Sequence, residues 1–378
     1  MSRIVTITHG YPSKARPNNC PFVKELMDTW HTMGVSILVV KPVTLHEYLR
    51  LAINRKTKDE FVRYPLYFDF SILRAFRCFP AVRRLHIKMA DRSFQRAVEK
   101  SVKIENQDIL YSHFLDSGFC AAALSEKYNV PAYCAVGEST LWTLEFRDMA
   151  EMRRRMKHIK GFIAVSGKNK KMLMNEGLAP EDRIKVFPNG VNLEKFHQLD
   201  KSKCRSELGI EPDKVAGVFL GHFIERKGSL RVAMATEGIE NLQMIYIGAG
   251  DQDPQGSNIV FKGRVEHEEI PRYLSAADFF ILPTKAEGCC NAIIEAMACG
   301  LPIISSDRDF NDDILNAECS IRINPDDIGD IRTAVNRMVA DKNLRKAMSQ
   351  ASLNTVQMFD LGRRANNILN YIGYVYEL

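Results

Sequence analysis

Short apolar runs rich in β-branched residues alternate along the whole chain with longer segments whose apolar positions recur at helical spacing. This alternation is typical of β-α-β units stacked around parallel sheets. The pattern predicts strands at residues 4–8, 36–40, 109–112, 131–136 and 161–166, and at 215–220, 242–247, 258–261, 279–282 and 302–305. Two separate sets of about five strands predict two sheets in an α/β protein.

The turn-forming run Pro188-Asn189-Gly190 lies between the two sets, where the charge also changes sign. Residues 1–190 carry 31 Lys and Arg against 19 Asp and Glu, a net charge of +12, and the rest of the chain has a net charge of −6. We therefore predict an N-terminal domain over 1–188 and a C-terminal domain over 189–357. Ligands of such domains lie at the carboxyl ends of the strands.

The composition excludes several classes of protein. With 46% hydrophobic and 26% charged residues, the 378-residue chain is neither disordered nor collagen-like. No apolar run approaches the roughly 18 residues that cross a membrane, and no secretory signal precedes the first strand. The nine Cys residues have no paired spacing, which favours free thiols in a reducing compartment. We expect a cytoplasmic protein.

The strongest motif is the strand, loop and helix over residues 279–300. Glu295 lies among Ile, Ala and Met on the predicted helix, and a buried carboxylate needs a cation, a proton or a hydrogen-bonding ligand. Glu287 lies in the preceding loop, and the helix start at Cys290 and Asn291 offers amide groups to a phosphate. The alternative is that Glu295 pairs with a Lys or Arg and that Glu287 is solvated.

A second strand and loop, residues 218–228, carries His222 and Lys227, which are suited to an anionic ligand, followed by Gly228. Taken alone, this loop favours a solvated turn. Together with the loop before the predicted helix at 290–299, on the same sheet edge, it favours a site for a nucleotide diphosphate. Gly248-Ala249-Gly250 is an incomplete dinucleotide-binding pattern, because Asp253 replaces its third glycine. The two Asp-x-Asp pairs at 251–253 and 307–309 each offer only two carboxylates to a divalent cation, so we expect no metal.

These residues together resemble the family 4 glycosyltransferases, retaining enzymes of the GT-B fold, over nearly the whole chain. The family pattern of an aliphatic strand, Pro-Ser/Thr, Glu-Gly and Glu-Ala-Met-Ala-x-Gly is matched from Ile281 through Ile304. Residues 187–192 and 261–265 are also similar to the family. The resemblance looks strongest to bacterial cell-surface polysaccharide enzymes of the teichuronic acid type. It implies two Rossmann-like domains facing across a cleft, with a C-terminal helix at about 358–378 crossing back to the first domain.

The resemblance also implies a role for individual donor-side residues. Glu295 would hold the ribose of a nucleotide-sugar donor, and Glu287 would contact the transferred sugar. The diphosphate would be cradled and neutralised by the backbone of Cys290 and Asn291, by Lys227, and by His222, which replaces the usual Arg. The base would lie near Gly263 to Val265. The donor is a substrate, and no cofactor is expected.

The acceptor side departs from the family pattern. The strand ending at His113 is family-like, but the usual His-Gly-x-Asp element reads Val136-Gly137-Glu138-Ser139. If the usual His contacts the donor sugar, Glu138 or His113 must supply that contact instead. For His113 alone, a structural role at a strand end is as plausible as a catalytic one.

Basic residues interleave with aromatic ones in two N-terminal segments, 74–103 and 147–171, and Phe68, Phe70, Phe76 and Phe79 lie in or before the first. This mixture fits an anionic membrane presenting a lipid-linked acceptor. The alternative is a solvated helix face, since Val82, Leu85, Met89 and Phe94 form a core-facing stripe. Nucleic acid is not an expected partner, because no recognised binding motif accompanies the charge.

We therefore predict a hexosyltransferase that moves a sugar from a nucleotide-diphosphate donor to a glycan or lipid-linked saccharide, at the inner face of the cell membrane or in the cytoplasm. Two other functions are compatible with the same residues. One is a nucleotide-sugar epimerase of the GT-B fold, and the other is a non-catalytic protein that binds membrane or nucleic acid through its basic half.

Overall fold

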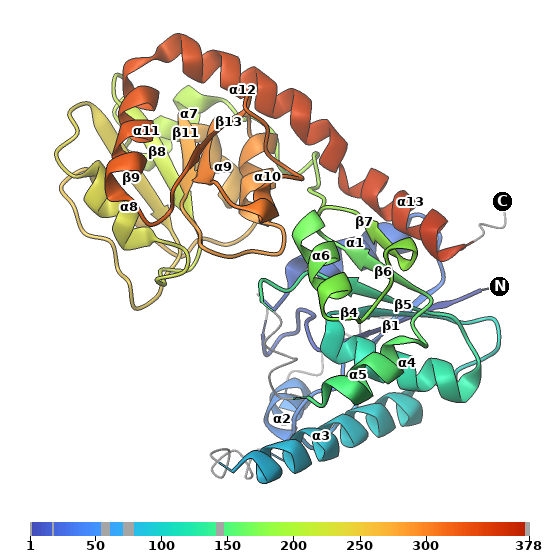
Figure 1. Ribbon diagram of the computed structural model, residues 1–378. Helices are drawn as coiled ribbons and strands as arrows, with labels where there is room; N and C mark the ends of the chain where they lie inside the picture. Colours follow the sequence, from blue (N-terminus) through green and yellow to red (C-terminus); the bar gives the residue numbers. More distant parts are fainter. Residues whose placement is uncertain (1, 17–18, 54–60, 71–78, 141–146, 375–378) are drawn as a thin grey trace. The chain divides into compact units, whose positions relative to one another are not determined.

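The computed structural model describes residues 2–16, 19–53, 61–70, 79–140 and 147–374. The chain forms two compact units, residues 1–187 with 365–378 and residues 188–364, each built on one sheet (Figure 1). Every pairing between neighbouring strands of these sheets is parallel. The predicted α/β class with two Rossmann-like sheets is confirmed.

The first unit has a seven-stranded sheet in the order β3-β2-β1-β4-β5-β6-β7. Its strands are β1 (Ile4–Thr8), β2 (Ile37–Val40), β3 (Val62–Arg63), β4 (Ile109–His113), β5 (Ala132–Val136), β6 (Gly161–Ala164) and β7 (Ile184–Val186). Its helices are α1 (Pro21–Thr32), α2 (Leu45–Ile53), α3 (Pro80–Ser101), α4 (Leu115–Tyr128), α5 (Met149–Met156) and α6 (Gly167–Asn175).

Two apolar clusters cover the two faces of this sheet. One cluster joins Val5 and Ile7 of β1 to α3, α4, α5 and α6, and the other joins Ile4 of β1 to α1 and to residues 365–374. The split between Ile4 and Val5 follows from the period of two along a strand, which sends successive side chains to opposite faces. Residues from the far end of the chain, including Ile368 and Leu369, are therefore part of the first unit's core.

The second unit has a six-stranded sheet in the order β10-β9-β8-β11-β12-β13. Its strands are β8 (Val215–Leu220), β9 (Leu242–Ile247), β10 (Ile259–Gly263), β11 (Phe279–Leu282), β12 (Ile303–Ser306) and β13 (Ser320–Ile323). Its helices are α7 (Lys201–Leu208), α8 (Ser229–Thr236), α9 (Ile270–Ala276), α10 (Asn291–Ala298), α11 (Ile328–Ala340) and α12 (Lys342–Val356), and α13 (Leu361–Ile372) follows. The Asp200, Asp327 and Asp341 side chains cap α7, α11 and α12 by accepting backbone N–H bonds.

All ten predicted strands are present, with ends that differ by at most two residues. Three strands escaped prediction: β3, β7 and β13, and each is the last strand at an edge of its sheet. Edge strands are half-covered, so they need fewer apolar residues than the central ones. The run Ile184-Lys185-Val186 of β7 shows this, because Lys185 is exposed.

Candidate active site

The strand order of the second sheet reverses between β8 and β11, which are neighbours at its centre. In open parallel sheets, this switch point is where the loops after the two strands open a ligand site at the carboxyl edge. The loop after β8 carries His222 and Lys227, and the loop after β11 carries Glu287 and leads into α10. The predicted donor-side residues therefore surround the switch point.

Glu287 is held by three donors that converge on its Oε1 atom. Lys227 Nζ lies 2.6 Å away, Arg226 Nη1 3.0 Å and the Thr284 hydroxyl 2.7 Å. Only 12% of the Glu287 side chain is exposed, so the alternative of a solvated carboxylate is wrong. Arg226 also donates to the Ala286 carbonyl, and the Lys285 N–H donates to the Arg226 carbonyl at 2.8 Å. These bonds fasten the two loops to each other.

Arg226 and Thr284 were not among the predicted site residues. Arg226 is adjacent to Lys227, and Thr284 occupies the Pro-Ser/Thr position of the β11 loop, so both were visible in the motifs. What the sequence does not show is that they share one oxygen of Glu287 with Lys227.

Glu295 lies on the one face of α10 that is not fully buried, together with Asn291 and Ala292. Its side chain is 13% exposed, and its Oε1 is 3.1 Å from His267 Nε2. Lys195 Nζ lies 2.8 Å from the other ring nitrogen, Nδ1. Because an ammonium group can only donate, Nδ1 accepts and Nε2–H donates to Glu295. The expectation that this carboxylate needs a partner is confirmed, but the partner is a histidine and not a Lys or Arg.

The loop before α10 is tied to the segment that begins the second unit. Asn189 Nδ2 donates to Asn291 Oδ1 at 2.7 Å and to the Cys289 carbonyl at 3.4 Å. Cys290 is the N-cap of α10, no side chain caps the helix, and its first turn contains no acidic residue. The amide end of α10 thus keeps the positive field that favours an anion. Burial raises the pKa of the Cys290 thiol to about 11 and that of Cys289 to about 12, so both are neutral thiols at pH 7.

The Gly248-Ala249-Gly250 run packs against the loop after β8. A Cβ atom on Gly248 would lie 2.0 Å from the Gly221 carbonyl oxygen, and one on Gly250 would lie 2.1 Å from that of Phe223. These glycines therefore allow two backbones to approach closely, which accounts for the incomplete dinucleotide-binding pattern. The Gly248 N–H also donates to the Gly263 carbonyl at 2.8 Å.

Two further predicted donor-side residues lie at this edge. Val265 is half-buried, two residues beyond Gly263. His222 is exposed, and its carbonyl accepts the Ile224 N–H at 2.9 Å.

In the first unit, His113, Gly137 and Glu138 lie at the ends of the adjacent strands β4 and β5. His113 is 2% exposed and is surrounded by the rings of Phe22, Tyr111 and Phe114. Glu138 Oε1 accepts the Leu115 N–H at 2.6 Å and Oε2 accepts the Gly137 N–H at 2.9 Å. Burial raises the pKa of Glu138 to about 7. The backbone bonds of Glu138 fix the start of α4, which accounts for this carboxylate structurally.

In the described parts of the chain, no three His, Cys, Asp or Glu side chains gather in a way that could hold a metal ion. Asp253, one of the predicted Asp-x-Asp residues, is paired with Lys262 at 2.6 Å. None of the described helices is long and apolar enough to span a bilayer.

Comparison with known protein families assigns both units. Residues 22–195 match the family described as Glycosyltransferase Family 4, and residues 215–341 match the one described as Glycosyl transferases group 1. The chain belongs to the family 4 glycosyltransferases. The protein is therefore an enzyme, of the hexosyltransferase type, and the non-catalytic alternative is set aside.

Individual relatives agree with this family assignment. The chain is 24% identical to the putative teichuronic acid biosynthesis glycosyltransferase TuaC of Bacillus subtilis, over 96% of each chain. It is 25% identical to the UDP-Gal:alpha-D-GlcNAc-diphosphoundecaprenol alpha-1,3-galactosyltransferase of Escherichia coli, over 71% of this chain and 76% of that protein. The Anabaena protein HepE, solved in complex with UDP and glucose, superimposes with a TM-score of 0.68 at 15% identity, over 99% and 100% of the two chains. The similarity to solved structures therefore agrees with the sequence in assigning a GT-B fold to this glycosyltransferase.

Proposed function

We propose that this glycosyltransferase moves a sugar from a nucleotide-diphosphate donor to a hydroxyl group of a glycan or lipid-linked saccharide in cell-surface polysaccharide synthesis, with retention of anomeric configuration. The observation that carries the proposal is the Lys227–Glu287 ion pair at the switch point of the second sheet. The E. coli relative takes a UDP-sugar by name, and HepE was solved with UDP and glucose. Both support a nucleotide-sugar donor.

The geometry around Glu295 suits a ribose. Its Oε1 accepts from His267, while the described residues offer no donor to Oε2. A ribose presents adjacent hydroxyl groups, which can donate to this carboxylate. The amides at the start of α10 and the Lys227 ammonium would then bind the diphosphate, and the backbone near Gly263 and Val265 would contact the base.

In the proposed reaction, the bond between the anomeric carbon and the diphosphate oxygen breaks, and the acceptor hydroxyl oxygen bonds to that carbon on the same face of the sugar. The hydroxyl proton passes to the departing phosphate oxygen. Lys227 stabilises the charge that develops on that phosphate, and Glu287 keeps the ammonium in place through a 2.6 Å contact. We also propose that Glu287 contacts the transferred sugar.

We propose that His222 contributes less to the phosphate contact than the Arg that is usual in the family, because an imidazole carries at most one charge. The phosphate then depends mainly on Lys227 and the helix amides. These groups supply the positive charge that the leaving group needs, and we propose no metal or other cofactor.

We further propose that the enzyme works on the inner face of the cell membrane, where a lipid-linked acceptor would be presented. The support for this is the exposed basic face of α3, which includes Arg84, Lys88 and Arg92.

The proposal is tested by a thermal-shift and calorimetric screen of the protein against UDP, GDP, ADP and their common sugar conjugates. The same screen is run on Glu295→Ala and on Glu318→Ala, a matched control because Glu318 is an exposed carboxylate in the same unit. We expect one nucleotide to bind selectively and only Glu295→Ala to lose affinity. Binding of no nucleotide, or equal loss in both variants, would contradict the proposal.

Product analysis then separates the transferase from an epimerase. A transferase releases free nucleoside diphosphate and extends the acceptor, whereas an epimerase yields an isomeric donor without an acceptor. The anomeric configuration of the product, read by NMR, tests retention.

A further inference from the structure

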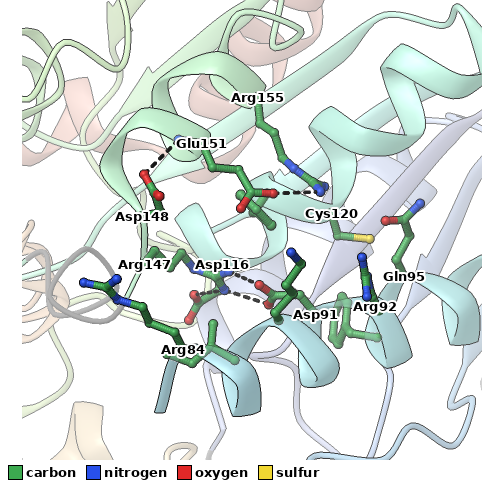
Figure 2. A pocket seen from close by; sticks show the side chains of 14 residues that line it. Arg84, Asp91, Arg92, Gln95, Asp116, Cys120, Arg147, Asp148, Glu151 and Arg155 are labelled. Carbon is green, nitrogen blue, oxygen red and sulfur yellow. Dashed lines mark hydrogen bonds and ion pairs between the residues drawn. The ribbon is translucent and has the colours of Figure 1, made fainter. Parts of the chain in front are cut away.

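The first unit contains a cavity of about 340 Å³ between α3, α4 and α5 (Figure 2). Five basic and four acidic side chains line it, together with apolar groups. The basic residues are Arg84, Lys88, Arg92, Arg147 and Arg155, and the acidic residues are Asp91, Asp116, Asp148 and Glu151. The function proposed above draws on Arg84, Lys88 and Arg92 only as an exposed basic face and gives the cavity itself no role.

Ion pairs and ring contacts hold Arg147 and Arg155 in the wall of the cavity. Arg147, whose side chain is 9% exposed, is ion-paired with Asp91 and, at 2.9 Å, with Asp116 (Figure 2). Its guanidinium carbon lies 4.6 Å from the centre of the Phe119 ring, and that of Arg155 lies 4.2 Å from the same ring. Two guanidinium groups are thus fixed beside one aromatic ring.

Each acidic group of the lining is already engaged. Asp91 and Asp116 pair with Arg147. Asp148 accepts two backbone N–H bonds at the start of α5, and Glu151 accepts from Arg155 at 3.2 Å. The five basic and four acidic side chains leave the lining with a net charge of +1.

Three basic side chains of the lining have no ion-pair partner among the described residues, and a fourth, Arg155, is paired with Glu151 through Nη2 only. Arg84, Lys88 and Arg92 recur every four residues, which places them on one face of α3, and none forms an ion pair with a described residue. Across the cavity, the Nε of Arg155 is buried and has no hydrogen-bond acceptor among the described residues. A buried N–H without an acceptor is costly, and an anion in the cavity would satisfy it.

Apolar side chains are exposed beside this basic face. Phe79, just before α3, is 58% exposed, and Leu85, in its second turn, is 54% exposed. Leu45 and Leu49 of α2 are also exposed. The expectation that Leu85 faces the core is therefore wrong, although Phe94 farther along α3 is buried. The predicted Arg74, Phe76 and Arg77 lie outside the described residues. Exposed apolar groups next to basic ones suit a lipid with an anionic headgroup.

The cavity also adjoins the edge of the sheet where acceptor chemistry is expected. Asp116 lies three residues after His113, the last residue of β4. His9, which follows β1, stacks on Phe94 with ring centres 4.0 Å apart and hydrogen-bonds Ser117 at 3.0 Å. A saccharide attached to an anion in the cavity could thus reach the carboxyl edge of the first sheet.

We propose that this cavity binds the phosphate or diphosphate linker of a lipid-linked saccharide acceptor, with Arg84, Lys88, Arg92 and Arg155 as its ligands. The proposal rests on the function proposed above and narrows its acceptor to one joined to its lipid through phosphate. Bulk anionic lipid is the competing source of the same chemistry, and the experiment separates the two.

The test uses the full-length protein and geranyl diphosphate, a water-soluble prenyl diphosphate, with binding measured by calorimetry. The cavity variant combines Arg84→Ala, Lys88→Ala and Arg92→Ala, three exposed positions at which the fold does not depend on the side chain. The control variant combines Arg96→Ala, Lys100→Ala and Lys103→Ala, which removes equal charge from exposed positions outside the cavity. Nucleotide binding is measured in parallel.

We expect the cavity variant to bind geranyl diphosphate at least tenfold more weakly than the wild type, while the control variant and all nucleotide affinities are unchanged. Equal affinity of the two variants for the probe, or no binding by the wild type, would overturn the proposal. If the cavity variant loses binding to phosphatidylglycerol vesicles but not to the probe, the face serves bulk lipid and the proposal is wrong.

The two proposals fail in different ways. A wild-type protein that binds the probe through the cavity but no nucleotide would overturn the proposed transfer reaction and leave the phosphate site standing. Arg155→Gln serves as a second variant, since it keeps a polar side chain but removes the buried Nε donor together with the ion pair to Glu151. We expect it to weaken probe binding while leaving the melting temperature within a few degrees of the wild type.

Discussion

Replacing His267 with alanine tests whether the Lys195–His267–Glu295 chain positions the carboxylate that we assign to the ribose. The change removes the only described donor to Glu295, a 3.1 Å hydrogen bond from Nε2. Glu295 itself is untouched, so a carboxylate is still present in the site but is no longer held in one orientation. His267 is thus a positioning residue in this reasoning and not a catalytic one.

The expected magnitude follows from the kind of bond that is lost. Hydrogen bonds to charged groups contribute about 1.5–3 kcal/mol, and partial exposure of both side chains, 26% for His267 and 13% for Glu295, places this one at the lower end. Part of that energy is recovered by water, so a loss of about 1 kcal/mol is expected. It corresponds to roughly a fivefold increase in the Kd of the nucleoside diphosphate.

The assay compares the nucleoside diphosphate with its 2′-deoxy analogue by calorimetry. If Glu295 contacts the ribose, the wild type prefers the ribonucleotide, and His267→Ala reduces that preference by raising the Kd of the ribonucleotide more than that of the analogue. His267→Gln, which can still donate, should recover part of the preference. His197→Ala, an exposed histidine of the same unit, is the matched control. An unchanged preference in His267→Ala would refute the positioning role, and an equal loss for both nucleotides would place the ribose elsewhere.

Three further predictions follow from the geometry. Lys227→Ala should lower kcat at least a hundredfold through loss of charge stabilisation at the phosphate, with a smaller change in KM, and steady-state kinetics in which only KM changes would contradict this. Glu138 has a folded-state pKa of about 7, above its unfolded value of 4.5, so its contribution to stability is complete below pH 4.5 and is lost as the pH rises through 7. The free energy of unfolding, measured with denaturant from pH 4.5 to 8, should therefore fall in the wild type relative to Glu138→Gln. Parallel curves for the two proteins would refute this. Gly248→Ala should destabilise the protein by about 3 kcal/mol or more, because the new Cβ would meet the Gly221 carbonyl. Gly238 also has a positive φ but open space around it, so Gly238→Ala should cost only about 1 kcal/mol. Equal losses of unfolding free energy in urea would show that backbone strain alone is responsible.

The parts of the fold that could be predicted are those set by local pattern. The central strands are apolar on both faces, so β1, β8, β9 and β11 have the predicted bounds. Gly300, the glycine of the Glu-Ala-Met-Ala-x-Gly pattern, follows the end of α10 with a φ of +73°, a conformation that favours glycine. The short edge strand β3 lacks such a pattern, because two residues paired on one side carry too little sequence information.

The candidate site was predictable in its location but not in its pairings. Glu287 and Lys227 are separated by about a sixth of the chain, and only the adjacency of β8 and β11 brings them to 2.6 Å. The same holds for His267, which lies in the loop assigned to the base but pairs with a carboxylate on α10. Glu138 shows a second limit of the sequence: its family-motif position predicts a contact with the donor sugar, but not that its carboxylate accepts the backbone N–H groups of Leu115 and Gly137.

The return of the chain end into the first unit has a consequence for biosynthesis. Ala365, Ile368 and Leu369 belong to the core against which α1 packs, so the part of that sheet face which α1 does not cover stays exposed until the ribosome has made the entire second unit. At roughly 5–20 residues per second, that delay lasts on the order of 10–40 s. During this interval the nascent chain exposes apolar surface, which makes it a client for chaperones. A premature stop before residue 365 would consequently leave the sheet of the second unit complete and remove part of the core of the first unit, which is synthesised first.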